Sequence, residues 1–446
     1  MNIKDRQILE LTAQVKALMV RIEELEQQVK ELKSPKDSSN SSTPPSHDHV
    51  SAIKNKSLRT KSARKRGGQP GHKGHTLQIS QTPDTVIDHI PDYCQVCGEG
   101  LAQQEGFQKE RRQVVDIPPI QPVYTEHRIY SKHCTCGKVN ISDFPSNVKA
   151  PIQYGAGVES MAAYFSVRQY LPYRRMKECF TDLFGIPVSE ASLVSAVRRM
   201  ADKSRPIYLR IKENILRSPV VGVDETGAKV NGKKSWFWTW QNTNNTFISV
   251  DPSRGYKLIK RLFPDGLANS ILVSDCWAAQ LKTPAITHQL CIAHLLRELN
   301  FFTQLYDDPW VKSIQELLLE ALKLKSEIED YSTDHLQRNQ LVERLDKLLE
   351  WKVEKRAKKI RAFHKRLRKN RDYLLVFLYH RNVPADNNAS ERAIRNVKVK
   401  QKISGQFINS DNAMDFAILR SVIDTTVKNA ANVFNTLKLV AQIAPE

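Results

Sequence analysis

The sequence of 446 residues has no apolar run of transmembrane length, and acids and bases interrupt the apolar pattern at its N-terminus, where a signal peptide has an apolar core. Acidic residues are scarce, because 48 Asp and Glu stand against 68 Lys and Arg, a net charge of +20. This excess predicts an anionic partner, usually nucleic acid or an anionic membrane surface. Because neither a signal peptide nor a transmembrane run is evident, we expect a cytoplasmic, soluble protein. Its length is sufficient for two to four domains.

Cysteine is also rare, with seven in the chain. Four of them form two close pairs, each followed by glycine: Cys94 with Cys97, and Cys134 with Cys136. Four thiolates in two tight turns can close a tetrahedral zinc site, so the spacing favours structural Zn²⁺ over disulfides. The second pair has one intervening residue instead of two, and free thiols, or His133 as a ligand, are alternatives. We expect a zinc ribbon with a strand-like segment over residues 114–130.

A seven-residue repeat runs through residues 8–32. β-branched residues alternate with leucines in this repeat: Ile8, Leu11, Val15, Leu18, Ile22, Leu25, Val29 and Leu32. This pattern favours a two-stranded parallel coiled coil, and hence a homodimer or larger assembly, or pairing with another chain. The alternative is an amphipathic helix that packs on its own domain.

A Ser-, Pro-, Asn- and Gly-rich segment follows and predicts a flexible linker. Between Ser51 and Thr76 it holds eight Lys or Arg and no acid, ending in RKRGGQPGHKGH. Glycines let a backbone lie close to DNA while Lys and Arg side chains contact phosphates, so this segment is either a DNA-binding arm or a solvated tether. The candidate contacts are Arg64, Lys65, Arg66 and Lys73.

The next region predicts two helices, one over residues 173–184 and one capped by Ser189, joined by a turn at 185–188. Basic residues lie on both helices. This pattern is typical of a helix-turn-helix, although any helical hairpin produces a similar one.

Two aspartates end apolar strands in the second half of the chain. Asp224 lies in VVGVDETGAKV, which an Asn231-Gly232 turn joins to a second strand, and Asp275 ends SILVSD. A carboxylate on a buried strand must be paired or bound to a cation, although a lone Asp is more often a turn or cap residue. The order of three antiparallel strands, a helix, a fourth strand and a late helix predicts a ribonuclease-H-like core. The first-strand and fourth-strand acids then converge with an acid from the late helix on a divalent metal.

Glu391 is the acid of the predicted late helix, which begins near Ser390. Lys398 lies seven residues beyond it, so the two share one helical face, with Arg395 nearby. A glutamate that binds Mg²⁺ beside basic side chains that bind phosphate would explain this grouping. Arg392, Arg395 and Lys398 are therefore candidate DNA contacts. The alternative is a surface helix in which Glu391 pairs with Arg395.

Several motifs in fixed order resemble the DDE transposases of insertion-sequence family sixty-six. They are VVGVDETGAKVNGKKSWFWTW, ILVSDCWAA, CIAHLLREL and NNASERAIRNVKVKQKISG, preceded by the zipper, the basic arm and the cysteine pairs. The resemblance implies Asp224, Asp275 and Glu391 as a catalytic triad that holds two Mg²⁺ (or Mn²⁺) ions. Asn387 and Asn388 stand where related enzymes carry tyrosine and arginine, which weakens the assignment of Lys398 as a DNA contact by resemblance.

The resemblance further implies a bacterial, nucleoid-associated transposase that binds terminal inverted repeats and target DNA, cuts strands and transfers them, without a membrane partner. Small accessory proteins are a further expectation. The rivals are a catalytically inactive sequence-specific DNA-binding protein and a metal-dependent nuclease of the same fold.

The resemblance also implies a helical insertion between Asp275 and Glu391, and residues 310–350 are amphipathic as it requires. Residues 352–371 then carry eleven Lys or Arg and one Glu, which indicates a solvated or a phosphate-binding face. Cys291-x-x-His294 has metal-like spacing without a second pair, so we expect a structural Cys291 and a His294 beside the active site.

The expected fold is multidomain α+β. Its parts are a coiled coil (1–33), a basic linker (34–83), a zinc ribbon (84–142), a helical, helix-turn-helix-like region (143–210), a ribonuclease-H-like α/β catalytic core (211–410) with a helical insertion at about 300–380, and a C-terminal helical segment (411–446).

Overall fold

The computed structural model describes residues 3–33, 71, 74, 76–331, 335–353 and 358–443. The chain divides into a larger unit, Met1–Asn55 with Tyr124–Glu446, and a smaller one, Lys56–Val123. All four predicted contacts of the basic arm lie outside the described residues: Arg64, Lys65, Arg66 and Lys73. No helix in the described part of the chain is long and apolar enough to cross a membrane.

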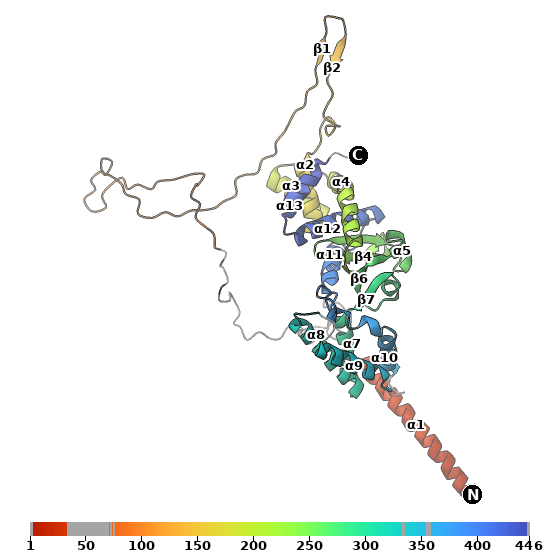
Figure 1. The fold of residues 1–446 in the computed structure, drawn as a ribbon. Coiled ribbons are helices and arrows are strands. Elements are labelled where there is room, and N and C mark those ends of the chain that lie inside the picture. Colours follow the sequence, from red (N-terminus) through yellow and green to blue (C-terminus); the bar gives the residue numbers. More distant parts are fainter. Residues whose placement is uncertain are drawn as a thin grey trace. The chain divides into compact units, whose positions relative to one another are not determined.

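The larger unit is built on a five-stranded sheet with the order β5-β4-β3-β6-β7 (Figure 1). The strands are β3 (Val220–Val230), β4 (Lys233–Gln241), β5 (Thr246–Asp251), β6 (Leu267–Ser274) and β7 (Ala285–Leu290). The first three are antiparallel, and β6 and β7 add in parallel. The predicted turn is confirmed, since Asn231 and Gly232 have φ of 48° and 72°, the left-handed values that such a turn needs. The sequence analysis missed β7.

Helices cover both faces of this sheet. On one face, Val221, Val223 and Leu272 pack with residues of α4 (Glu190–Leu216), α5 (Tyr256–Leu262), α6 (Ala278–Leu281) and α12 (Ser410–Lys428). On the other face, Ile271 and Val273 pack with α7 (Ile292–Leu305) and the helices that follow it. Successive residues of a strand point to opposite faces, so both faces of β6 are apolar.

The two predicted helices, one over residues 173–184 and one capped by Ser189, are confirmed as α3 (Tyr173–Phe184) and α4. Gly185 ends α3 with φ of 61°, and the Ser189 hydroxyl accepts a hydrogen bond from the Ser192 amide at 3.0 Å. Both helices share one core with α2 (Ala156–Ala163), the sheet, α11 (Asn388–Ser404), α12 and α13 (Val433–Gln442). The helical region, the catalytic core and the C-terminal segment, which we expected as separate domains, therefore share one core. Their limits stay a prediction.

The amphipathic segment between the second and third acids forms α8 (Pro309–Glu327) and α9 (Leu336–Glu350), followed by α10 (Lys358–Lys369). α10 buries Ile360, Phe363 and Leu367 and exposes most of its basic residues. The periodicity therefore predicted these helices correctly.

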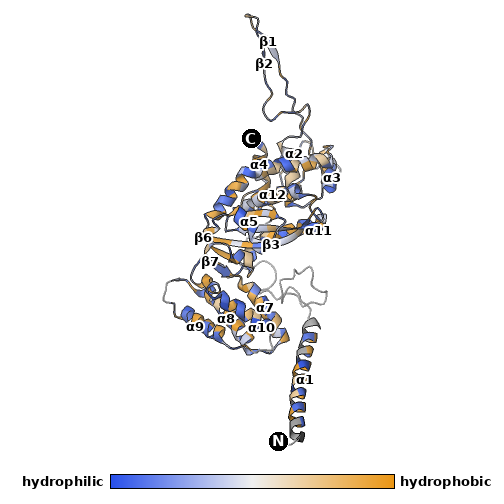
Figure 2. Ribbon diagram, turned by 90° about the vertical axis from the view of Figure 1, so that its right-hand side faces the viewer, coloured by the Kyte–Doolittle hydropathy of each residue, from blue (hydrophilic) through white to orange (hydrophobic). Residues whose placement is uncertain are grey.

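The N-terminal repeat forms one helix, α1 (Ile3–Lys33), along which hydrophobic and hydrophilic residues alternate (Figure 2). Its described repeat side chains are exposed, from 45% for Leu25 to 63% for Ile8.

The strand-like segment expected over residues 114–130 is wrong, because the structure has no strand there. Strands β1 (Ser131–His133) and β2 (Val139–Ile141) instead flank the second cysteine pair. Pro118, Pro119 and Pro122 lack the amide hydrogen that a strand needs for pairing.

Candidate functional site

The sheet brings Asp224 and Asp275 side by side. Strand β3 pairs in parallel with β6, and Gly222 lies opposite Val273. Two residues further along stand Asp224, inside β3, and Asp275, directly after the last residue of β6, so the two acids are neighbours where the parallel pairing ends. The expectation that Asp224 ends its strand is wrong, because β3 continues to Val230 in its pairing with β4. We call Asp224, Asp275 and Glu391 the acidic site.

Helix α11 brings Glu391 to the same place through a close contact with β3. The Asn387 side chain donates a hydrogen bond to the Val223 carbonyl at 2.6 Å, and its backbone oxygen accepts one from the Glu391 amide at 3.1 Å. A Cβ atom at Gly222 would lie 2.6 Å from Oγ of Ser390. The asparagine that looked like a departure from the related signature therefore anchors the first turn of the helix.

Negative charge is concentrated in this site. Burial raises the pKa of Asp224 well above its ordinary value, and the charges of Asp275, Glu225 and Glu391 raise it further. The Glu225 amide donates a hydrogen bond to Asp224 at 2.8 Å and opposes this shift. A cation bound among these oxygens would relieve the repulsion, and carboxylates are the ligands that Mg²⁺ prefers.

Two cations from α7 already face the acids. Nδ1 of His294 lies 2.9 Å from Asp275 and its Nε2 lies 3.6 Å from Glu391, while Arg297 lies 3.4 Å from Glu391. Burial by itself lowers the pKa of His294, but the Asp275 carboxylate and Cys291 outweigh it and raise the pKa to about 11. Glu391 thus pairs with α7, and no ion pair with Arg395 is found among the described residues.

Cys291 and His294 lie where the sequence analysis expected them. Donor atoms of Asp275, Cys291 and His294 lie within 4.8 Å of one another, a grouping that could hold a metal ion. However, Cys291 is buried and its sulfur accepts a hydrogen bond from the Asn387 amide at 3.2 Å. Nδ1 of His294 faces Asp275 and its Nε2 lies 3.0 Å from Nη1 of Arg297, so both ring nitrogens have partners, an arrangement that favours positioning of Asp275.

The predicted DNA contacts on α11 differ in their surroundings. Arg392 and Arg395 are exposed, with no ion pair in the described part of the chain. Lys398 donates a hydrogen bond to the Gly227 carbonyl at 2.5 Å, and partial burial together with Lys234 lowers its pKa. Arg392 and Arg395 are therefore free to meet phosphates, whereas Lys398 is already engaged.

The two cysteine pairs form similar turns. The Gly98 amide donates a hydrogen bond to the Cys94 carbonyl, and the Gly137 amide donates one to the Cys134 carbonyl, both at 2.9 Å. Hydrogen bonds lower the pKa of the first cysteine in each pair. The largest effect on Cys94 comes from the backbone of Cys97, and the largest effect on Cys134 comes from the backbone of Cys136. Zinc binds thiolates, so these turns suit a metal knuckle.

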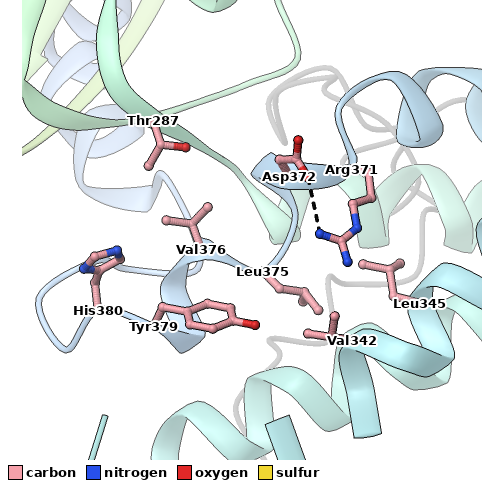
Figure 3. A pocket seen from close by; sticks show the side chains of 9 residues that line it. All are labelled: Thr287, Val342, Leu345, Arg371, Asp372, Leu375, Val376, Tyr379 and His380. Carbon is pink, nitrogen blue, oxygen red and sulfur yellow. Dashed lines mark hydrogen bonds and ion pairs between the residues drawn. The ribbon is translucent and has the colours of Figure 1, made fainter. Parts of the chain in front are cut away.

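A pocket in the helical insertion shares no residue with the acidic site (Figure 3). It is lined by Thr287, Val342, Leu345, Arg371, Asp372, Leu375, Val376, Tyr379 and His380. Its arginine is held by Asp346 at 2.7 Å and by Asp372 at 3.3 Å, so its charge is already neutralised. A phosphate would gain little there.

Comparison with known proteins matches three parts of the chain to family models. A family model described as the transposase IS66 family matches residues 151–415, which include all three acids. The zinc-finger binding domain of transposase IS66 matches residues 91–137, which include all four paired cysteines, and a family of unknown function matches residues 2–78. A comparison with curated proteins found no match.

A mixed sheet that gathers three acids, together with these matches, defines a transposase with a zinc-finger domain. Because the matched region covers more than half of its residues, the chain belongs to the IS66 transposase family.

Proposed function

We propose that the protein binds the terminal inverted repeats of its own insertion sequence, cuts a DNA strand at each end, and joins the freed 3′ hydroxyl to target DNA. The observation that carries this proposal is the convergence of Asp224, Asp275 and Glu391 where the pairing of β3 with β6 ends. The strand order β5-β4-β3-β6-β7, with three antiparallel strands and parallel additions, supports a ribonuclease-H-like core. The net charge of +20 suits a polyanionic substrate.

In this proposal the three carboxylates would hold two Mg²⁺ or Mn²⁺ ions, which would supply activation of water for cutting and of the 3′ hydroxyl for joining, and stabilisation of the leaving oxygen. Asn387 and Gly222 hold the backbone of α11 against β3, which sets the position of Glu391. His294 and Arg297 orient the carboxylates of Asp275 and Glu391.

The test is mobilisation of a marker flanked by the ends of the element, in cells that express the intact protein or Glu391→Gln. We expect the intact protein to move the marker and the variant to bind the ends without moving it. Equal mobilisation by both would refute the metal site.

Binding without mobilisation by either protein would favour the inactive DNA-binding rival, provided that accessory proteins are supplied. Cutting without joining would favour the nuclease.

We also propose that α1 pairs with a second copy in a coiled coil, since its repeat side chains are exposed in a single chain. Sedimentation should report twice the chain mass of 51.0 kDa. Leu18→Lys places a charge in the seam and should shift the dimer toward monomer. The control is Lys16→Ala, outside the repeat. A monomeric parent protein would contradict the coiled coil.

Structural Zn²⁺ is proposed to bind Cys94, Cys97, Cys134 and Cys136. Cys94→Ser and Cys134→Ser should each reduce the zinc content from about one per chain to almost none, because three ligands bind far more weakly than four. Metal analysis measures this, with Cys179→Ser as the control. Full zinc content in either knuckle variant would remove that cysteine from the site.

Other expectations stay predictions: DNA contact by the basic arm, by Arg392, Arg395 and Lys398, and by the exposed face of α10; the accessory proteins; and a cytoplasmic, nucleoid-associated location.

A further inference from the structure

Four side chains beside the acidic site form a stack of cations and indole rings. The guanidinium of Arg254 lies 4.6 Å from the Trp236 ring centroid and 3.8 Å from that of Trp277. The Lys234 ammonium lies 4.7 Å from the Trp236 ring. We call Lys234, Trp236, Arg254 and Trp277 the cation–indole stack.

The stack is held rigidly by a buried carboxylate. Nε and Nη2 of Arg254 donate to one oxygen of Glu225 at 2.9 and 2.7 Å, and Gln280 donates to the other oxygen at 2.5 Å. The Glu225 side chain is only 4% exposed. Arg254 therefore has a fixed plane on which Trp277 can rest, which reduces the entropy lost when a ligand binds.

The chain places this stack next to Asp224 and Asp275. Glu225 follows Asp224 directly on β3, and Trp277 stands two residues after Asp275. The charge of Asp275 also raises the pKa of Glu225, although burial is the larger cause and Arg254 opposes both. A ligand stacked on Trp277 would therefore contact a residue that is a close neighbour of Asp275 in the chain.

Trp277 is unusual among the aromatic residues around it. Trp238 and Trp240 of β4 are fully buried, whereas Trp277 is 38% exposed although Arg254 covers one side of its ring. A residue that served only to cover Arg254 would gain stability by burying its remaining surface. The exposed indole, backed by a cation, has the features of a platform for a nucleobase.

We propose that Trp277, supported by Arg254, stacks one unpaired nucleobase of the DNA beside the strand to be cut. The inference rests on the proposed function, since it needs DNA at the acidic site. The ammonium of Lys234, 4.7 Å from the Trp236 ring, adds positive charge for the neighbouring phosphates. Stacking on an aromatic ring is tolerant of base identity, so the platform recognises the unpaired state and not a sequence.

The test uses the full chain with its zinc bound, in buffer without Mg²⁺ or Mn²⁺, so that no strand is cut. The probes are two dye-labelled duplexes of one sequence, one with a single bulged 2-aminopurine and one with that base paired. We expect the parent protein to bind the bulged duplex about tenfold more tightly and to quench its 2-aminopurine fluorescence. Trp277→Leu should lose both effects and keep its affinity for the paired duplex.

Trp277→Tyr retains an aromatic ring and should retain both effects, which separates stacking from folding. Trp351→Ala is the matched control, because Trp351 is 48% exposed but lies in the insertion. Equal binding of the two duplexes by the parent, or an unchanged preference in Trp277→Leu, would overturn the platform. Because no Mg²⁺ or Mn²⁺ is present, neither result depends on whether Glu391 is catalytic.

Discussion

Asp224→Asn is expected to abolish strand cutting and joining, by at least about a thousandfold, and at the same time to make the metal-free protein more stable. Asparagine keeps the shape of the side chain but removes a charge that burial and three neighbouring carboxylates disfavour. The free energy of unfolding should rise by about 1 kcal/mol, as is common when a residue of a functional site is substituted. The measurements are cleavage of an end-containing plasmid and thermal unfolding in EDTA.

The sign of the pH dependence follows from the same pKa shift. The native pKa of Asp224 is raised, so the folded state holds this proton more tightly than the unfolded state. Its contribution to stability is present at low pH and is lost as the pH rises from about 4, the unfolded pKa, through the native value. The advantage of Asp224→Asn over the parent should therefore grow across this window and vanish below it.

Two comparisons make this expectation specific. Glu391→Gln should also stop cutting but should bring no gain in stability, because Glu391 faces His294 and Arg297 and its loss leaves those cations without a partner. Added Mg²⁺ should stabilise the parent more than Asp224→Asn, because the variant lacks one ligand. A less stable metal-free Asp224→Asn at pH 8 would contradict the electrostatic account.

Gly222→Ala is expected to be the most damaging small substitution in the sheet. Its Cβ atom would lie 2.5 Å from Nε2 of Gln241, 2.6 Å from Oγ of Ser390 and 3.0 Å from Oδ1 of Asn387. The first turn of α11 must then move away from β3, and Glu391 moves with it. We expect a loss of about 1–3 kcal/mol in unfolding free energy and a large loss of strand transfer.

Gly227→Ala on the same strand is the matched control. Its nearest contact would be 3.2 Å from Cε of Lys234, a flexible side chain that can turn aside. Unfolding and DNA cleavage should therefore stay close to those of the parent. If Gly222→Ala is as stable and active as Gly227→Ala, close packing of α11 does not position the acid.

The strands and helices with strong local signals could be predicted from the sequence. The apolar runs around Asp224 and Asp275, the Asn231-Gly232 turn and the Ser189 cap each depend on neighbouring residues, and all are present in the structure. The error at residues 114–130 arose because hydrophobic content outweighed the prolines. Strand β7 was missed because its six residues, AITHQL, carry little apolar periodicity.

By itself the sequence determined the heptad helix, the paired cysteines and the basic character, because each depends on spacing or composition along the chain. The three acids were predicted from the order of the strands and the family resemblance. Only the tertiary structure decided how the acids are held. Asn387 reaches the Val223 carbonyl across 164 residues, and Arg297 approaches Glu391 across 94. Such partners leave no period or spacing in the sequence, because packing of the sheet against α7 and α11 alone brings them together.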